Sequence, residues 1–197
     1  MPLGTSKVRF FAGFRTVPVG RDSPCPPRLL AFVTDGDGDM AFRIIVDTRE
    51  KAEYSFACPV VHQKLDAGDY SVEGFAQRVA VERKSLADFV HTVIHDFDRF
   101  AAELEKLSLM DAACVVVEAD LDEVLRGLQA DALRSVSPHS LLGATVLIAL
   151  RWRVPIYWCG SRQAACAFTD AFLRTFVRQA VTQDECHRQF KGGGHLG

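Results

Sequence analysis

The feature of this sequence that most constrains its fold is a pair of short apolar runs, each of which ends in a carboxylate. The first run extends from Phe42 to Asp47 and the second from Ala112 to Glu118. Continuous apolar runs of this length are typical of strands that are buried on both faces. Because segments with helical periodicity lie between them, we expect units of strand and helix, as in an α/β domain.

Shorter segments rich in β-forming residues follow the first run. They are Val60 to Leu65, Tyr70 to Val72 and Arg78 to Glu82, and they are separated by Gly68 and Gly74. This composition is typical of a meander or of hairpins. We therefore expect these segments to complete one half of a sheet.

Helical periodicity accounts for most of the remaining chain. A helix is predicted to begin at Ser85, because apolar residues from Leu86 to Ile94 form a single stripe at helical spacing. Further helices are predicted over 99–109, 137–150 and 162–181, with one more strand over 154–158. Together these elements predict a central mixed sheet that is flanked by helices.

Both ends of the chain differ from the middle. Residues 1–40 hold a proline-rich stretch and an Asp-Gly repeat, and they show no sustained period of either kind. We expect 1–40 to form a disordered tail or linker, 41–182 to form one globular domain and 183–197 to form a flexible C-terminal tail. Met40 stands directly before the first predicted strand and is an alternative start of the chain.

Composition narrows the classes of function. No stretch of 18 uncharged apolar residues is present, and the six cysteines include no C-x-x-C pair. We expect a soluble, intracellular protein without membrane contact, cytoplasmic or associated with the nucleoid in a bacterium. A formal net charge of -2 argues against coating nucleic acid by charge alone, but it suits an acidic metal site beside local basic patches.

Charged residues gather at the predicted strand ends. Asp47 ends the first strand, Asp69 stands at the start of another, and Glu82 and Lys84 lie two residues apart near the end of a third. Residues two apart share one face of a strand, so Glu82 and Lys84 project together while Arg83 points away. Carboxylates that hold a divalent metal can activate water for phosphodiester hydrolysis, and a lysine can stabilise the developing charge. The arrangement has the form of the PD-(D/E)xK nucleases.

A more specific resemblance rests on the full string of residues. Gly68-Asp69-Tyr70, followed by Glu82-Arg83-Lys84 and Asp88, resembles the G-D-x(n)-E-R-K-x-x-x-D signature of the XPF-type structure-specific endonucleases, which include the archaeal Hef nucleases. Further blocks match in the same order, and they are Val46 to Glu50, Arg99 to Leu104 and Val116 to Glu118. The resemblance spans roughly 42–181.

This resemblance implies a restriction-endonuclease-like fold and an endonuclease that uses Mg²⁺ or Mn²⁺ to cut DNA, on branched or flapped substrates in repair or recombination. It implies metal-binding roles for Asp47, Asp69 and Glu82, and a catalytic role beside them for Lys84. It implies supporting roles for Glu50, Arg83 and Asp88.

Several of these residues also have structural interpretations. Asp88 lies three residues after Ser85, so it can belong to a helix-capping box. Arg83 can bind phosphate or form an ion pair with a carboxylate such as Asp88. Arg99 and Glu103 are four residues apart, as in a surface ion pair on one helix, and we therefore expect no catalytic role for them.

The chain departs from larger members of that family. Only 16 residues follow Val181, too few for the family's helix-hairpin-helix module, and no phosphate-binding loop of an ATPase is present. We expect a stand-alone nuclease of bacterial or phage type, with DNA as its substrate and a protein partner that supplies duplex or junction binding. The alternatives are a non-catalytic DNA-binding or scaffold subunit, and a resolvase or restriction-type nuclease on the same fold.

The resemblance also implies a homodimer formed through this domain. An aromatic face on the last predicted helix could contribute to it, and its residues are Phe168, Phe172 and Phe176. The same face could instead pack on the sheet, and we favour that interpretation.

Overall fold

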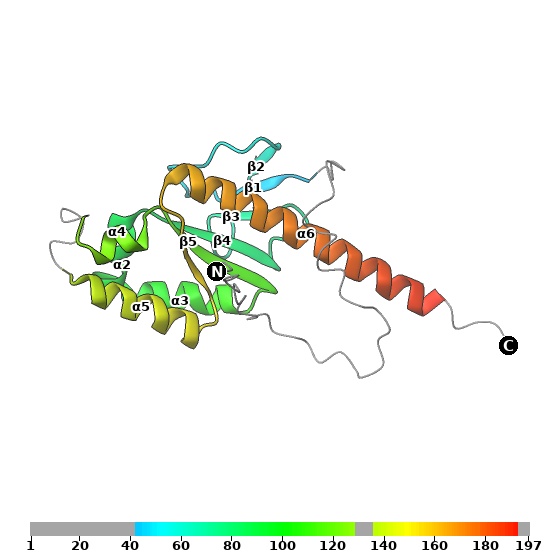
Figure 1. The fold of residues 1–197 in the computed structure, drawn as a ribbon. Coiled ribbons are helices and arrows are strands. Elements are labelled where there is room, and N and C mark those ends of the chain that lie inside the picture. The colour runs from blue at the N-terminus through cyan, green and yellow to red at the C-terminus, as the bar shows by residue number, and fades with distance from the viewer. Residues whose placement is uncertain (1–41, 129–135, 193–197) are drawn as a thin grey trace, which may run out of the picture. The chain divides into compact units, whose positions relative to one another are not determined.

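In the computed structural model, residues 42–128 and 136–192 are described, so the predicted tail over 1–40 lies outside the described residues. Six strands form one mixed sheet in the order β2-β1-β3-β4-β5-β6. Figure 1 shows the ribbon of this sheet with its helices. The strands are β1 (Ile44–Val46), β2 (Val60–His62), β3 (Tyr70–Val72), β4 (Val79–Lys84), β5 (Ala112–Val117) and β6 (Ile156–Trp158). The helices are α2 (Leu86–His95), α3 (Phe97–Ser108), α4 (Leu121–Leu125), α5 (Pro138–Arg151) and α6 (Arg162–Gly192).

The sheet has two parallel parts, β2-β1 and β4-β5-β6, and β3 joins them by antiparallel pairing. Strand β3 pairs antiparallel with both β1 and β4, whereas β4, β5 and β6 pair parallel. Helices connect β4 to β5 and β5 to β6, as the alternation of strand and helix in that part of the sequence predicts. The α/β fold with a mixed central sheet is therefore confirmed.

One part of the predicted meander is wrong. Strand β2 does not pair with β3, which follows it in sequence, but lies at the edge of the sheet and pairs parallel with β1. Its residues Val60 and His62 are exposed, so they suit an edge and not the sheet interior. The strand also ends at His62, before Leu65, which is buried in the following loop.

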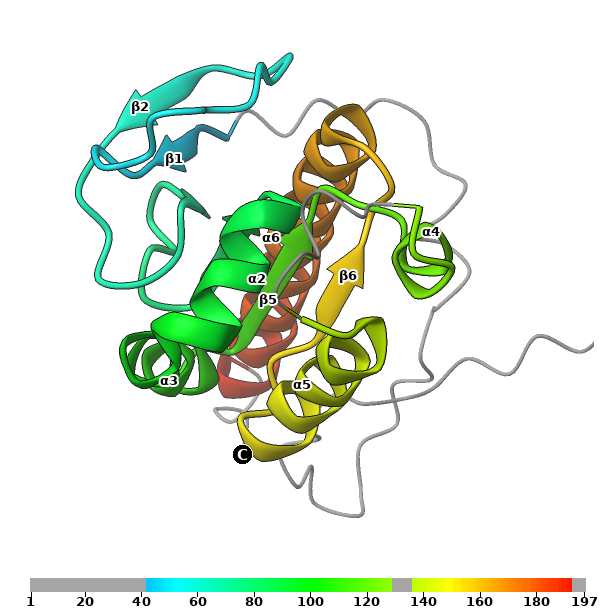
Figure 2. The same cartoon turned by 90° about the vertical axis from the view of Figure 1, so that its left-hand side faces the viewer.

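Alternation along β4 and β5 divides the core between the two faces of the sheet. Ala80 and Val115 belong to a core that includes Phe89 and Leu104, and this face is covered by α2, α3 and α5. Val81 and Val116 point to the other face, where α6 covers them (Figure 2). Since successive strand residues alternate between faces, the same alternation decides which side of the sheet each charged residue of β4 reaches.

The aromatic face of α6 packs on the sheet, as we favoured. Phe168, Phe172 and Phe176 are partly buried against the core on that side. The Phe176 ring meets the edge of Phe75, with a distance of 5.7 Å between ring centroids. The aromatic face of α6 is therefore used for packing within the domain.

The predicted helix starts are confirmed at two places. The Ser85 hydroxyl accepts a hydrogen bond from the backbone N–H of Asp88 at 3.1 Å and caps α2. Ser137 caps α5 in the same way, and Pro138 occupies its first turn. A polar side chain that accepts from the free N–H groups of a first turn stabilises such a helix by about 1 kcal/mol.

Two helices differ from the prediction. The backbone of α6 stays helical to Gly192, so the predicted C-terminal tail does not begin at 183. The reason is that 183–191 contains neither glycine nor proline, and most of its residues tolerate a helix well. The short α4 was not predicted, because five residues are too few for a periodic signal, although Asp120 caps it at Glu123 N–H.

None of the helices in 42–128 and 136–192 combines the length and the apolar character that crossing a bilayer requires.

Candidate active site

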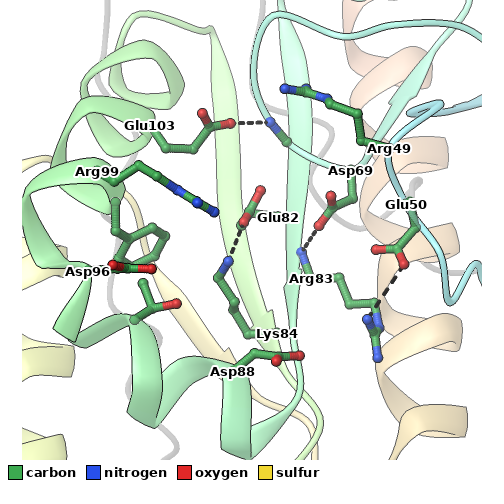
Figure 3. A pocket seen from close by; sticks show the side chains of 13 residues that line it. Arg49, Glu50, Asp69, Glu82, Arg83, Lys84, Asp88, Asp96, Arg99 and Glu103 are labelled. Carbon is green, nitrogen blue, oxygen red and sulfur yellow. Dashed lines mark hydrogen bonds and ion pairs between the residues drawn. The ribbon is translucent and has the colours of Figure 1, made fainter. Parts of the chain in front are cut away.

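A cleft of about 580 Å³ lies between the loops that flank β1 and β3, the end of β4 and the helices α2 and α3 (Figure 3). Its charged lining residues are Arg49, Glu50, Asp69, Glu82, Arg83, Lys84, Asp88, Asp96, Arg99 and Glu103. All but one of the residues with a predicted catalytic, metal-binding or supporting role therefore meet at this cleft. The exception is Asp47.

Strand β4 brings Glu82 and Lys84 together on the face covered by α2 and α3. The ammonium of Lys84 lies 2.8 Å from a carboxylate oxygen of Glu82, and both side chains are largely buried. Burial raises the pKa of Glu82, although the charge of Lys84 opposes this shift. Burial would lower the pKa of Lys84, but Glu82 outweighs it and the pKa lies above its ordinary value, so the ammonium stays charged.

Asp69 is the residue directly before β3, and its side chain reaches the same cleft. Its carboxylate accepts a hydrogen bond from the backbone N–H of Arg83 at 2.8 Å, which ties it to β4. Burial, followed by the nearby charge of Glu82, raises the pKa of Asp69 to about 8. The ionised forms of Asp69 and Glu82 therefore repel one another, and a cation placed between them would relieve that repulsion.

The turn before β3 requires glycine. Gly68 has a φ angle of 77°, and a Cβ atom at this position would lie 2.9 Å from Cβ of Ala80 and 3.2 Å from the carbonyl oxygen of Val81. Side chains strongly disfavour a positive φ, and the close approach to β4 leaves no room for one. This glycine lets Asp69 lie against β4.

Glu103 lines the cleft, although the sequence analysis assigned it no role. Its carboxylate accepts a hydrogen bond from the backbone N–H of Gly68 at 2.8 Å, and its charge contributes to raising the pKa of Glu82. The spacing from Arg99 to Glu103 suggested an ion pair along one helix. The match of Arg99 to Leu104 with a family block was the signal that could have indicated a role at the site.

Asp47 is buried outside the cleft lining. Its carboxylate accepts hydrogen bonds from the backbone N–H of Arg49 at 2.7 Å, from the backbone N–H of Leu65 at 2.6 Å and from the guanidinium of Arg49. Burial alone would raise the pKa of Asp47, but these hydrogen bonds outweigh it and the pKa lies below its ordinary value. The backbone N–H of Asp47 donates to the carbonyl oxygen of Asp69 at 2.8 Å, so Asp47 lies beside the cleft, but its carboxylate is engaged by Arg49 and Leu65.

Arg83 points to the opposite face from Glu82 and Lys84, as predicted, and it pairs there with Glu118. Its guanidinium donates to both carboxylate oxygens of Glu118, at 2.8 and 3.0 Å. A second carboxylate, that of Glu50, lies 3.7 Å away. The structural partner of Arg83 is therefore Glu118 and not Asp88, which was suggested from the sequence.

The same network reaches the start of α6. Arg162 donates to Glu118 at 2.9 Å and to the backbone carbonyl oxygens of Ala52 and Glu53, at 2.8 and 2.6 Å. The guanidinium also stacks over the ring of Tyr54, with 4.9 Å to the ring centroid. Arg162 thereby fixes the loop that presents Glu50, a link that local sequence patterns could not reveal because it joins residues about 110 positions apart.

Asp88 lines the cleft from the first turn of α2, near Lys84 (Figure 3). Its carboxylate accepts a hydrogen bond from the Ser85 hydroxyl at 2.6 Å, and its N–H donates to the same hydroxyl. Ser85 therefore caps the helix, but Asp88 accepts from the Ser85 hydroxyl and not from its backbone N–H as a capping box requires, and Asp88 also lines the cleft.

Within the described ranges, no three or more side chains of Asp, Glu, His or Cys are arranged as a ready ligand set for a metal ion. The donor chemistry nevertheless fits Mg²⁺, because this ion commonly binds through one or two carboxylates and keeps several waters. Asp69 and Glu82 are two such carboxylates. Glu50 and Glu103 line the same cleft and could complete the set.

A mixed sheet that holds a D…E-x-K group in one cleft defines the restriction-endonuclease-like class of nuclease folds. The chain belongs to the ERCC4 domain family, which comprises XPF-type nuclease domains, because the pattern of the ERCC4 domain matches residues 46–172. This confirms the resemblance that the sequence motifs indicated, and it makes the domain a nuclease that acts on DNA.

Two solved structures are similar to the chain. XPF from Aeropyrum pernix is 19% identical with a TM-score of 0.54, over 79% of this chain and 75% of that chain. XPF from Aeropyrum pernix in complex with DNA is also 19% identical with a TM-score of 0.54, over 70% of this chain and 66% of that chain. At this identity the similarity shows the fold. Among curated protein sequences, none matches this chain.

Proposed function

We propose that this protein is an endodeoxyribonuclease that hydrolyses phosphodiester bonds with Mg²⁺ or Mn²⁺, on branched or flapped DNA in repair or recombination. The observation that carries the proposal is the convergence of Asp69, Glu82 and Lys84 at one cleft, two carboxylates and one amine in the order that the family motif has. Membership of the ERCC4 domain family supports the nuclease activity. The metal, the mode of cleavage and the DNA structure are our proposal.

In this proposal Asp69 and Glu82 hold the metal ion, and Glu50 stands at the same cleft as a further oxygen ligand. A bound divalent ion supplies charge for the phosphorane and acidifies a water molecule. Lys84, held 2.8 Å from Glu82, orients the attacking water or stabilises charge on the phosphate. Its burial strengthens this effect, since charges interact more strongly away from bulk water.

The supporting residues act through these groups. Arg83 links Glu118 to Glu50 and so holds Glu50 at the cleft, while its backbone N–H holds Asp69. Asp88 fixes the start of α2 at the cleft wall. We assign Asp47 to positioning, because its oxygens are already engaged by Arg49 and Leu65.

The proposed partner is DNA. The structure of Aeropyrum pernix XPF in complex with DNA supports it, since that protein shares the fold. We further propose a homodimer through the nuclease domain, as the family resemblance implies, and a protein partner that supplies binding to duplex or junction.

The test is a cleavage assay on flap, fork, four-way junction, duplex and single-stranded DNA, with Mg²⁺, Mn²⁺ or EDTA. We expect cleavage with either metal, loss of cleavage in EDTA, and a decrease of at least about 100-fold in Glu82→Gln and Lys84→Met. Glu105→Gln is the matched control, because Glu105 is an exposed residue of α3 that does not line the cleft.

The outcomes separate the alternatives. A wild-type protein that binds these DNAs but cuts none of them with either metal is a scaffold subunit, and the proposal fails. Cleavage confined to four-way junctions identifies a resolvase, and cleavage of plain duplex at a fixed sequence identifies a restriction-type nuclease.

A further inference from the structure

The cations of the cleft differ in whether the protein already neutralises them. Three of its four basic side chains are paired with carboxylates of the protein. The pairs are Lys84 with Glu82 at 2.8 Å, Arg83 with Glu118 at 2.8 Å and Arg49 with Asp47 at 2.7 Å. The fourth is Arg99, whose guanidinium forms no ion pair or hydrogen bond with any residue that the structure describes.

Arg99 is free because its expected partner is engaged elsewhere. Glu103 lies four residues further along α3, the spacing of a helical ion pair, but its carboxylate accepts the N–H of Gly68 at 2.8 Å. Next to Arg99, Phe100 is buried in the core and fixes which way this turn of α3 faces. The guanidinium of Arg99 consequently points into the cleft, toward Glu82 and Lys84 (Figure 3).

The lining of the cleft is acidic on balance, so an unpaired cation within it could receive a negatively charged substrate. This lining carries six carboxylates against four basic side chains. The carboxylates are Glu50, Asp69, Glu82, Asp88, Asp96 and Glu103. A DNA phosphate that enters this surface is repelled unless a bound metal ion and a free basic group receive it, because the paired cations are largely neutralised.

We propose that Arg99 binds a phosphate of the DNA strand that is cut, at or next to the scissile bond. A guanidinium presents a planar fork of donors that matches two oxygens of one phosphate, and it stays charged at every physiological pH. The inference rests on the proposed function and adds a substrate-contacting residue to it. An arginine that only keeps α3 soluble would make no such contact.

The first measurement compares kcat/KM of Arg99→Ala, Arg99→Lys and Arg126→Ala on the best substrate of the wild type. We expect Arg99→Ala to lose roughly 100-fold and Arg99→Lys to recover part of it, since lysine keeps the charge without the fork. Arg126→Ala should stay within about twofold. It is matched in charge, because Arg126 is an exposed arginine directly after α4, outside the cleft, that pairs with Asp122.

The second measurement identifies the phosphate. Substrates carry a single uncharged methylphosphonate at each of the positions around the cut, and each is cleaved by the wild type and by Arg99→Ala. If Arg99 binds one of these phosphates, the losses from the substitution and from that methylphosphonate are not multiplicative, since both remove the same contact. At the other positions the losses multiply.

The outcomes distinguish the two proposals. If the wild type is active but Arg99→Ala matches it, or if the losses multiply at every phosphate, the role of Arg99 is overturned and the nuclease proposal stands. If the wild type cuts no DNA with Mg²⁺ or Mn²⁺, the nuclease proposal fails, and the role of Arg99 fails with it.

Discussion

At the scale of single residues, a substitution of Asp47 tests whether this buried carboxylate stabilises the fold or binds the metal ion. We expect Asp47→Asn to lower the free energy of unfolding by about 3 kcal/mol, because an amide cannot accept from Arg49 and Leu65 with both of its ends. The side chain is 1% exposed, so water cannot replace these partners. Urea unfolding of wild type and variant at pH 7 gives the difference.

The pH dependence of that difference has a defined sign. The pKa of Asp47 in the fold lies below its ordinary value of 3.8, so its stabilisation is present above that value and disappears as the pH falls through the lower, folded pKa. The two proteins should therefore converge in stability in strong acid. A variant that is as stable as the wild type at pH 7 but has lost its response to metal would place Asp47 among the ligands.

How much of the site the sequence could predict depends on the range of each contact. Glu82 and Lys84 share a face because strands have a period of two, and that local rule placed them correctly. The contact of Glu103 with Gly68 joins residues 35 positions apart, and no local pattern encodes it. The hydrogen bond from Leu65 N–H to the Asp47 carboxylate joins residues 18 positions apart, and the short β-rich segment did not reveal that Leu65 lies in a loop.

At the scale of elements, the turn that joins Gly68 to β3 sets the distance between β3 and β4. We expect Gly68→Ala to destabilise the fold by about 2 kcal/mol or more, since alanine is strained at positive φ and its Cβ would meet Ala80. Asp69 would also shift away from Glu82. The measurement is urea unfolding together with the rate of cleavage at a temperature where the variant is folded.

Gly74 provides the matched control for this prediction. It has a φ of 83°, but an added Cβ there would meet nothing within 4 Å. Gly74→Ala should therefore show the cost of the backbone angle without the clash and should leave cleavage unchanged. Equal losses of stability and activity in the two variants would contradict a special role for the approach of Gly68 to β4.

Helices and strands were predicted well where the signal lay within one turn of the chain. They were predicted poorly where contacts with distant segments determine the pairing. The starts of α2 and α5 followed from Ser85 and Ser137, whose hydroxyls act within one turn. The pairing of β2 with β1 did not follow, because the same short segment fits a hairpin equally well. The network that joins Arg162 to the loop of Glu50 also depends on the finished fold.

At the scale of the whole molecule, the acidic cleft that would bind a metal ion lowers the stability of the fold when no ion is bound. Asp69 is partly buried near the buried Glu82, and the pKa of Asp69 is raised to about 8, so its ionised form costs the folded protein free energy. The sign is the reverse of that for Asp47, because this cost grows as the pH rises from about 4 to 8. A divalent ion removes the cost by binding both carboxylates.

We therefore expect Asp69→Asn to be more stable than the wild type in EDTA, by about 1 kcal/mol at pH 8, and less responsive to Mg²⁺. The wild type should gain about 2.7 kcal/mol when Mg²⁺ is at 100 times its dissociation constant, whereas the variant should gain little. The amide oxygen can still accept from Arg83 N–H, so that hydrogen bond is kept. Thermal unfolding with and without Mg²⁺ measures both effects.

Asp66→Asn supplies the control, because Asp66 is an exposed neighbour in sequence that pairs with Gln77 and does not line the cleft. It should follow the wild type in EDTA and in Mg²⁺. If Asp69→Asn is instead destabilised in EDTA and keeps the full response to Mg²⁺, then Asp69 stabilises the fold without binding the ion. In that case the ligands must be sought among Glu50, Glu82 and Glu103, the other carboxylates that approach the same point of the cleft.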